Sequence, residues 1–343
     1  MQSPEPVTVG IVNYNGMETV GNTLDSVRGL AYEPIKKIIV ADDNSTDGSP
    51  EFIRENYPEA AIVRLERNTG SASVRNRILE EAGTDLVFII DNDITLTPDC
   101  LDKLVSVKRK APGAGVIHPH ILDEDNPSEP QPYNGGWIHY LCAFIPGRHP
   151  DMNAEYEAFD TVSGAGMLID KTISDRIGGF DSDYFFNWED GDFTFRSAIS
   201  GYPCLNVPQA PVYHKSKPRG KSRVFYQVRN RWYFIFKMYS FKTILVCLPA
   251  FIVYEISLAG LMLVKKTFFQ YLNGNIQAVL DAPRTLKKRR KVQALKKRKD
   301  SEALRAGDIY VPESMLGGKL AQKAKNIYAG IFSLYWDGVK DFL

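Results

Sequence analysis

Between residues 7 and 215 the chain alternates short apolar runs with stretches of helical period, and this alternation limits the possible folds more than any other feature. The apolar runs lie at 7–13, 35–41, 61–65 and 86–90, and the helical stretches between them lie at 17–30, 51–57 and 73–82. Strands separated by helices predict an α/β fold, with a mostly parallel sheet flanked by helices. Further strand-like and helical segments are expected at 161–170 and 192–200, whereas 122–160 reads as a long, partly irregular insertion.

Polar clusters follow two of the predicted strands directly: Asp42-Asp43-Asn44 and Asp91-Asn92-Asp93. In open α/β sheets, ligands bind outside the carboxyl ends of the strands. The placement of the clusters at these ends therefore predicts a ligand site, although each cluster could also be a polar turn that caps the next helix.

Asp91 and Asp93 are candidate ligands for a metal ion. Hard carboxylates suit Mg²⁺ or Mn²⁺, and such a cation neutralises charge on a departing diphosphate. A neutral imidazole at His214, after another apolar stretch, could complete the metal shell. A single D-x-D sequence is more often a solvated turn, and a lone histidine is more often structural.

A nucleotide would use other residues. Asp42 and Asp43 could accept hydrogen bonds from a base or a ribose. The turn at Asn68 and Gly70, followed by Arg75 one helical turn later, resembles a seat for a diphosphate. An ordinary helix start with a surface arginine is the alternative.

Trp188-Glu189-Asp190 is the candidate catalytic segment. Direct transfer of a sugar with inversion requires a carboxylate that deprotonates the acceptor hydroxyl. Asp190 is the candidate base, Glu189 would orient the acceptor, and Trp188 offers a face for a sugar ring. The alternative is an exposed acidic loop.

In this order and spacing, the segments resemble those of the family 2 glycosyltransferases, which have the GT-A fold. The resemblance covers about residues 6–215 and rests on 12–15, 42–49, 68–76, 91–93, 164–166, 178–181 and 188–190. It implies that Asp42 contacts the nucleotide base and that Asp91 and Asp93 hold the metal and the diphosphate. The nucleotide pocket that it implies comprises Asn13, Tyr14, Asn15, Asp42, Asp43, Asn68, Gly70, Arg75, Asn76, Asp91 and Asn92.

The resemblance also implies that Asp190 is the base. The adjacent tryptophan is similar to that of galactofuranosyl- and rhamnosyl-type members, in some of which a histidine like His214 binds the metal. Processive members carry a Q-x-x-R-W sequence, but here the segment from Gln227 to Trp232 has one residue too many. A single-addition enzyme is therefore expected.

The C-terminal third, 226–343, is expected to form a helical, membrane-associating region after a catalytic domain at 1–225. Thr243 to Val264 has one charged residue, Glu255, and would be about 33 Å long as a helix, enough to cross a bilayer. Basic residues flank it on both sides, against the positive-inside tendency. A re-entrant or interfacial hairpin with both flanks cytosolic is therefore expected, while a true span and a buried or oligomer-forming helix remain open.

Two further features favour contact with a membrane. The basic runs 287–291 and 296–299 are expected to contact anionic lipids. A final amphipathic helix carrying Trp336 would lie in the interface; its other apolar residues are Leu316, Leu320, Ile327, Ile331, Phe332 and Tyr335. Because the basic runs contain no aromatic residues, nucleic acid is not an expected partner.

The overall composition gives little information about the function of the chain. The 42 Lys and Arg nearly balance the 41 Asp and Glu, although acids concentrate early and bases late. The cysteines Cys100, Cys142, Cys204 and Cys247 are far apart, which favours a reducing compartment. The first six residues do not resemble a secretory signal.

The expected function is metal-dependent, inverting transfer of one sugar from a nucleotide diphosphate to a lipid-linked saccharide at the cytoplasmic face of a membrane. A non-catalytic membrane-binding module and a nucleotidyltransferase that forms sugar nucleotides are the alternatives. The nucleotidyltransferase would need a Gly-rich basic loop where this chain has Asn13-Tyr14-Asn15-Gly16. The sugar, the acceptor linkage and the oligomeric state, including a homo-oligomer, stay open.

Overall fold

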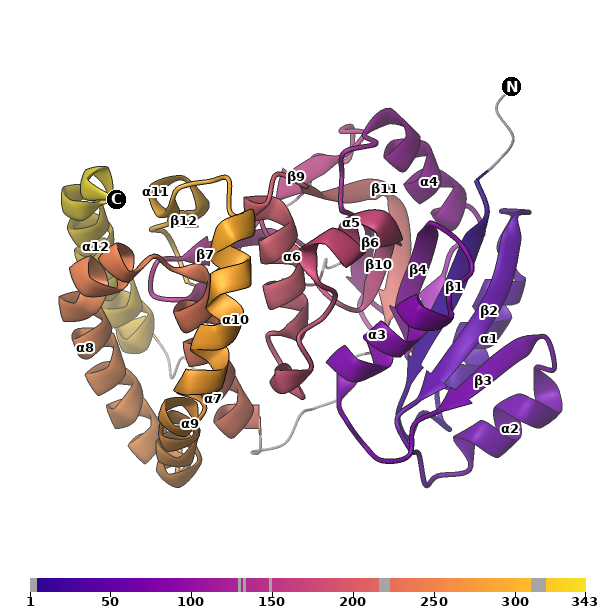
Figure 1. Ribbon diagram of the computed structural model, residues 1–343, viewed down its shortest axis with the longest axis horizontal. Helices are drawn as coiled ribbons and strands as arrows, with labels where there is room; N and C mark the ends of the chain where they lie inside the picture. The colour runs from indigo at the N-terminus through magenta and orange to yellow at the C-terminus, as the bar shows by residue number, and fades with distance from the viewer. Residues whose placement is uncertain (1–4, 129–130, 132–133, 148–149, 216–222, 310–318) are drawn as a thin grey trace. The chain divides into compact units, whose positions relative to one another are not determined.

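A computed structural model describes the chain except for residues 1–4, 129–130, 132–133, 148–149, 216–222 and 310–318 (Figure 1). Its internal contacts divide the chain into two compact units. Unit 1 comprises Met1–Gly135, Arg148–Ala198 and Tyr202–Pro218, and unit 2 comprises Gly136–Gly147, Ile199–Gly201 and Arg219–Leu343.

Unit 1 is built on a nine-stranded mixed sheet. Its strands are β1 (Val7–Asn13), β2 (Ile35–Asp42), β3 (Ala60–Arg64), β4 (Leu86–Asp91), β5 (Ile94–Leu96), β6 (Val116–Asp123), β9 (Glu157–Phe159), β10 (Gly166–Asp170) and β11 (Cys204–His214). The order is β3-β2-β1-β4-β10-β6-β11-β5, with β9 beside β11. The first four strands are mutually parallel, β10 runs antiparallel to both β4 and β6, and β11 is parallel to β6. The carboxyl ends of β1, β2, β4 and β11 therefore lie at one edge of the sheet.

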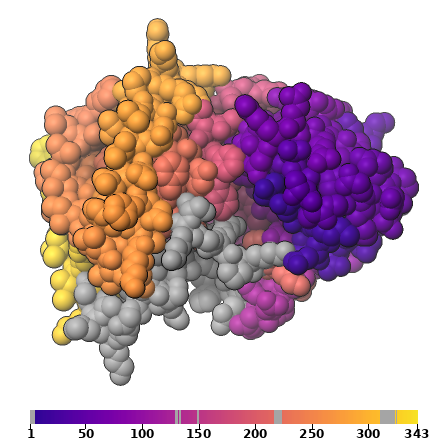
Figure 2. Space-filling model, turned by 90° about the horizontal axis from the view of Figure 1, so that it is seen from below, coloured from indigo at the N-terminus to yellow at the C-terminus, as the bar shows by residue number. Residues whose placement is uncertain are grey.

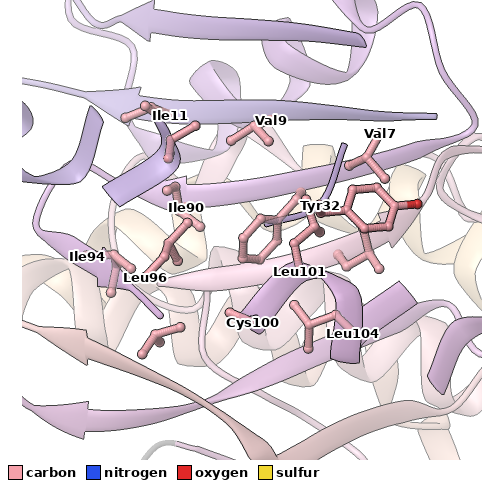
Figure 3. Packing of buried hydrophobic residues seen from close by; sticks show 14 of the residues in the cluster. Val7, Val9, Ile11, Tyr32, Ile90, Ile94, Leu96, Cys100, Leu101 and Leu104 are labelled. Atoms are coloured by element: carbon pink, nitrogen blue, oxygen red, sulfur yellow. The ribbon is translucent and has the colours of Figure 1, made fainter. Parts of the chain in front are cut away.

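Helices cover both faces of this sheet. They are α1 (Val20–Arg28), α2 (Ser49–Asn56), α3 (Ser71–Glu81), α4 (Cys100–Lys110), α5 (Lys171–Ile177) and α6 (Glu189–Ile199), with a short 3₁₀ helix at Ser182–Tyr184. Val9 and Ile11 of β1 pack with Leu101 of α4 in one apolar core (Figure 3). Gly10, between them in sequence, faces the opposite side because side chains alternate along a strand. A Cβ there would lie 2.2 Å from Ile78 of α3, so only glycine allows α3 to approach this closely.

The predicted fold class is confirmed in unit 1, and two local predictions are wrong. The helix expected at 192–200 begins at Glu189, so Glu189 and Asp190 lie in its first turn, where the helix dipole favours acidic side chains. In the segment expected as a strand at 161–170, only Gly166–Asp170 forms one.

Unit 2 is mainly helical. Its elements are β7 (Gly136–His139), β8 (Ala143–Pro146), α7 (Arg223–Met238), α8 (Phe241–Val264), α9 (Phe268–Leu280), α10 (Ala282–Leu295), α11 (Asp300–Ala303), β12 (Leu304–Arg305), α12 (Lys319–Val339) and a 3₁₀ helix at Lys340–Phe342. The strands β7 and β8 form a hairpin, and β12 pairs in parallel with β7. The insertion expected to be partly irregular at 122–160 thus supplies two strands of this small sheet, β7 and β8, and β9 of the large one.

The packing of α12 buries part of the apolar face that was expected to lie in a membrane interface. Trp336 is buried, and its ring stacks on Tyr140 at 4.9 Å between centroids. Phe332 is also buried, and its carbonyl accepts a hydrogen bond from the Tyr140 hydroxyl. These two aromatic side chains pack inside unit 2 and are not available to a membrane, whereas Ile327 and Ile331 of the same helix are exposed, so the interfacial placement of α12 stays a prediction. Leu316 and the side chain of Leu320 lie outside the described part of the chain.

Candidate functional site

Asn13, the last residue of β1, joins three segments at the carboxyl edge of the sheet in unit 1. Its buried amide group donates to Asp42 Oδ2 at 2.8 Å and to Ser49 Oγ at 3.0 Å. The oxygen of the same side chain, Oδ1, accepts from Asn92 Nδ2 at 2.8 Å. The ends of β1, β2 and β4 are therefore fixed to one another by a single amide.

The two acids at the end of β2 are buried and accept several hydrogen bonds each. Asp42 accepts hydrogen bonds from Asn13 and from the backbone and hydroxyl of Ser45. Asp43 accepts from the backbone N–H groups of Thr69 and Gly70, at 2.7 and 2.8 Å. Both carboxylates shape turns in this structure, and the contact expected between Asp42 and a nucleotide base stays a prediction.

Other expected nucleotide-binding residues differ in accessibility. Tyr14 is 50% exposed, and Asn68 is exposed as well. Asn15 lies in the left-handed region, at φ 49°, and its side-chain oxygen accepts from the Thr46 backbone. Asn76 exchanges hydrogen bonds of 2.8 Å with the backbone of Phe180 and so secures the turn before the 3₁₀ helix. Tyr14, Asn15 and Asn68 are thus the accessible members of this set.

Gly70 permits the close approach of two segments that carry site residues. It has φ +85°, and a Cβ there would lie 2.0 Å from the carbonyl oxygen of Phe185. We expect Gly70→Ala to reduce the free energy of unfolding by more than about 3 kcal/mol, from backbone strain plus steric overlap. Gly48 has the same φ but open space around its Cβ position, so Gly48→Ala should cost only about 1 kcal/mol. Equal losses in urea denaturation would contradict the role given to the Phe185 contact.

Arg75 on α3 is the centre of a buried charge network. Its guanidinium lies 2.8 Å from Asp91 Oδ1 and 3.3 Å from Glu189 Oε1, and it donates to the Gly164 carbonyl at 3.1 Å. Burial opposes its charge, but Asp91, Glu189 and Asp190 together raise the pKa of Arg75. Arg75 is buried among acids and orients Asp91, so the alternative of a surface arginine is wrong. Its expected part in seating a diphosphate stays a prediction.

Glu189 faces α3. Its carboxylate accepts from Ser71 Oγ at 2.5 Å and pairs with Arg75, and only 7% of the residue is exposed. Burial, and then the charge of Asp190, raise the pKa of Glu189 to about 7, although Arg75 and Ser71 oppose the shift. The geometry supports a role in holding Arg75 and gives no support to the expected contact with an acceptor.

Asp190 is held by the backbone on both sides. Its Oδ2 accepts from Gly164 N–H at 2.9 Å, and its Oδ1 accepts from Gly191 N–H at 2.7 Å. Gly164 also accepts from Arg75, so Asp190 is linked through one residue to Arg75 and Asp91. Each carboxylate oxygen keeps a lone pair for a further hydrogen bond.

The backbone just before Asp190 is strained. Asn187 and Trp188 both have positive φ, 64° and 70°, which is uncommon for any residue other than glycine and rare for a bulky one. Such strain concentrates at functional sites. Trp188 is half-buried beside Gly191. The segment that carries the tryptophan is thus held in a special conformation, which the sequence did not indicate.

Asp93, in the turn before β5, meets His214, the last residue of β11. Asp93 Oδ1 lies 3.3 Å from His214 Nε2, is buried, and makes no hydrogen bond within the described part of the chain. His214 Nδ1 lies 2.9 Å from the side-chain oxygen of Gln131, which favours a proton on Nδ1 and a lone pair on Nε2. Two electron-rich atoms then face each other, as the ligands of a shared cation do.

Asp91 is not gathered with this pair. In the described residues, no group of three His, Cys, Asp or Glu side chains is arranged to hold a metal ion. The expected trio of Asp91, Asp93 and His214 is therefore divided, because Asp91 pairs with Arg75. The sequence reasoning also missed Ser71, Gly164 and Gln131, which lie far along the chain from the groups they contact.

Unit 1 thus has a sheet like that of the GT-A fold, with acids at the end of β4 and a carboxylate at the start of α6. Comparison with known proteins leads to the same family. A sequence model described as glycosyl transferase family 2 matches residues 8–178. The chain belongs to this family. It is a glycosyltransferase, and the GT-A fold predicted from the sequence is confirmed.

Two groups of relatives of this family 2 glycosyltransferase have named activities. N-acetylglucosaminyl-diphospho-decaprenol L-rhamnosyltransferase of Mycobacterium tuberculosis is 28% identical over 217 residues, which is 56% of this chain and 71% of the relative. Poly-beta-1,6-N-acetyl-D-glucosamine synthase of Staphylococcus epidermidis is 29% identical over 187 residues, 53% of this chain and 43% of that one.

Solved structures share the fold at low sequence identity. The mannosyltransferase PcManGT of Pyrobaculum calidifontis, in complex with GDP-Man and Mn²⁺, has a TM-score of 0.53 and 18% identity, covering 98% of this chain and 88% of that one. GalNAc-T7 with UDP, GalNAc and Mn²⁺ has a TM-score of 0.59 and 17% identity, covering 70% of this chain and 49% of that chain.

Proposed function

We propose that this glycosyltransferase moves one sugar from a nucleotide-diphosphate donor to a lipid-linked saccharide at a membrane, inverting the configuration at the sugar carbon. The observation that carries the proposal is the fixed carboxylate of Asp190, joined through Gly164 to Arg75 and Asp91. Asp91 lies at the end of β4, where the diphosphate is expected to bind. One connected network of side chains would therefore hold both the base, Asp190, and the residue next to the leaving group, Asp91.

Inversion follows from the roles of the side chains. A single displacement needs one base on the acceptor side and no protein nucleophile. Asp190 would accept the proton of the acceptor hydroxyl as that oxygen attacks the sugar carbon and the nucleoside diphosphate leaves. Arg75 would hold Asp91 in place, and the half-buried Trp188 would offer its face to the sugar.

The donor set of Asp93 and His214 fits Mg²⁺ or Mn²⁺, with Gln131 orienting the imidazole. A bound cation would supply charge neutralisation for the departing diphosphate. Structural neighbours solved with Mn²⁺ support this part of the proposal.

The class of acceptor is suggested by the mycobacterial relative, whose name specifies a lipid diphosphate saccharide and L-rhamnose. The altered Q-x-x-R-W segment favours single addition over polymer synthesis. A lipid-linked acceptor is held at a bilayer, so a membrane surface is the proposed place of action. The basic residues at both ends of the apolar segment favour its cytosolic side.

The reaction is tested with a panel of nucleotide sugars, including a dTDP-linked rhamnose, and a polyprenyl-diphosphate N-acetylglucosamine acceptor in detergent with Mn²⁺. We expect one donor to be consumed and one sugar to be added. NMR of the product should show the anomeric configuration opposite to that of the donor. A product with the donor's configuration would rule out inversion, and no donor turnover with any sugar would favour a binding module.

The metal part is tested by changing its ligands. Asp93→Ala and His214→Ala should each weaken the activation by Mn²⁺ strongly, while Gln131→Ala should weaken it about 10- to 100-fold, as loss of an orienting partner does. Titration calorimetry with Mn²⁺ and UDP measures this independently of turnover. Asp123→Ala, at the end of the neighbouring β6, is the matched control. Full activity of the native enzyme in excess EDTA would contradict metal dependence.

A further inference from the structure

The acidic residue of α8 points into unit 2. Glu255 pairs with Arg231 of α7 and accepts a hydrogen bond of 2.6 Å from the Tyr271 hydroxyl. The Arg231 guanidinium also lies over the rings of Trp232 and Tyr254, about 5 Å from each centroid, and donates to the Leu141 carbonyl. The one carboxylate of this apolar segment is therefore paired inside unit 2 and is not turned outward.

The outward side of α8 is apolar instead. Eight of its large hydrophobic residues are 45–78% exposed: Phe241, Leu245, Leu248, Ile252, Val253, Ile256, Leu263 and Val264. A helix on a water-facing surface normally turns its polar residues outward. Within the described residues, α8 is the one helix long and apolar enough to cross a bilayer. On α8 the outward side is apolar and the charged residue faces inward, the reverse of a helix on a water-facing surface. This arrangement suits a lipid environment.

Two neighbouring helices continue this pattern. In α9, the residues Phe269, Leu272, Ile276, Val279 and Leu280 are 40–76% exposed, and in α12, Ile327, Ile331 and Leu334 are 58–77% exposed. The Tyr335 hydroxyl of α12 donates to the Val246 carbonyl of α8, and Tyr271 ties α9 to α8. Figure 1 shows α8 and α12 side by side. We call the exposed residues of these three helices the apolar surface.

A basic stripe lies on α10, which packs against α7 and α9. Arg284, Lys287, Arg290 and Lys291 are exposed on α10, which is orange in Figure 2. Two other basic residues of the expected lipid-binding runs point inward: Arg289 donates to the Phe236 carbonyl and Lys296 to the Met238 carbonyl. Residues 219–343 contain 24 Lys and Arg against 8 Asp and Glu, a formal charge of +16. An anionic surface is the complement of this charge.

We infer that the apolar surface lies in one leaflet of an anionic bilayer, with α8 in the membrane plane and the α10 stripe on the lipid headgroups. Lys242 at one end of α8 and Lys265 and Lys266 at the other are all exposed and can reach headgroups of the same leaflet. The charge of +16 opposes pairing of two copies through this surface. The inference rests on the proposed function in placing the enzyme beside a lipid-linked acceptor.

Vesicle binding by the full-length enzyme tests the surface. With phosphatidylcholine vesicles containing phosphatidylglycerol we expect cosedimentation, and with phosphatidylcholine alone or at high salt we expect weaker binding. Ile256→Asn, Phe269→Ser and Ile331→Asn, one on each helix, should each reduce binding about tenfold. The control Met152→Ser, also exposed but in unit 1, should bind normally. Unchanged binding in all three variants would overturn the inference.

The in-plane placement is tested with introduced cysteines. The four native cysteines are buried, so an impermeant maleimide will label Lys242→Cys and Lys265→Cys selectively. In sealed membrane vesicles of one orientation, both positions should be labelled from the same side. Labelling from opposite sides would show that α8 crosses the bilayer and would overturn the inference.

Two further results separate the competing explanations. Donor hydrolysis in detergent should be the same in the three apolar variants as in the native enzyme. If neither the native enzyme nor any variant hydrolysed a donor, the proposed function would be wrong, but the inference about the apolar surface would not be affected. A dimer that forms without lipid and dissociates in the apolar variants, together with no vesicle binding, would assign the surface to a second copy and overturn the inference.

Discussion

Asp190→Asn is expected to lower kcat for sugar transfer about 10³-fold while leaving donor affinity nearly unchanged, since a general base contributes on the order of 10²- to 10⁴-fold. The amide keeps the size of the side chain, and its oxygen can still accept one of the two backbone hydrogen bonds that orient Asp190. The change therefore removes proton acceptance with little effect on the fold. Steady-state kinetics and donor titration calorimetry measure the two quantities separately.

The control is another carboxylate of unit 1. Asp175 on α5 is exposed and pairs with Lys171, so Asp175→Asn should leave both kcat and donor affinity unchanged. A decrease in donor affinity equal to the decrease in kcat would show that Asp190 binds the donor and is not the base. Recovery of transfer with an acceptor whose hydroxyl has a lower pKa would support proton abstraction directly.

Arg75→Met is expected to lower the free energy of unfolding by about 3–5 kcal/mol, because removal of one partner of a buried ion pair leaves the others uncompensated. Here two partners remain, Asp91 at 2.8 Å and Glu189 at 3.3 Å. The Gly164 carbonyl also loses a donor. Donor affinity should fall as well, since Asp91 loses the group that orients it. Urea denaturation followed by circular dichroism gives the stability.

Arg77 on the same helix provides the matched control. Its side chain is 46% exposed, and it pairs with Glu80 and Glu81 at the surface, so Arg77→Met should cost less than about 1 kcal/mol. Adding Glu189→Gln to Arg75→Met should restore part of the stability, because one of the two stranded carboxylates is then neutral. Equal losses for Arg75→Met and Arg77→Met would show that the buried network contributes little.

Local sequence was sufficient for most of the sheet in unit 1. Runs such as 7–13 and 86–90 are almost continuously apolar, and a strand buried on both faces needs that composition whatever its neighbours are. The pairing of β12 with β7 could not be predicted in this way, because the two strands lie more than 150 residues apart in the sequence. Pairing at such a distance leaves no local pattern.

The residues of the candidate site show the same difference between what local sequence predicts and what depends on distant segments. The positions of Asp42, Asp91 and Asp93 at strand ends followed from the pattern of residues, since a run of apolar residues ends where polar ones begin. The partners of these acids did not follow. That Arg75 is buried between Asp91 and Glu189, and that Gln131 contacts His214, depends on how segments up to 114 residues apart are brought together.

The sequence by itself determined the class of fold, the family, and which acids lie at the edge of the sheet, because strand periodicity and the order of motifs are properties of neighbouring residues. Only the tertiary structure decided the direction of each charged side chain. Glu255 illustrates the difference: in the sequence it interrupts an apolar helix, whereas in the fold Arg231 and Tyr271 hold it inside unit 2. Burial and pairing of a charge are set by groups distant along the chain, so they follow from packing alone.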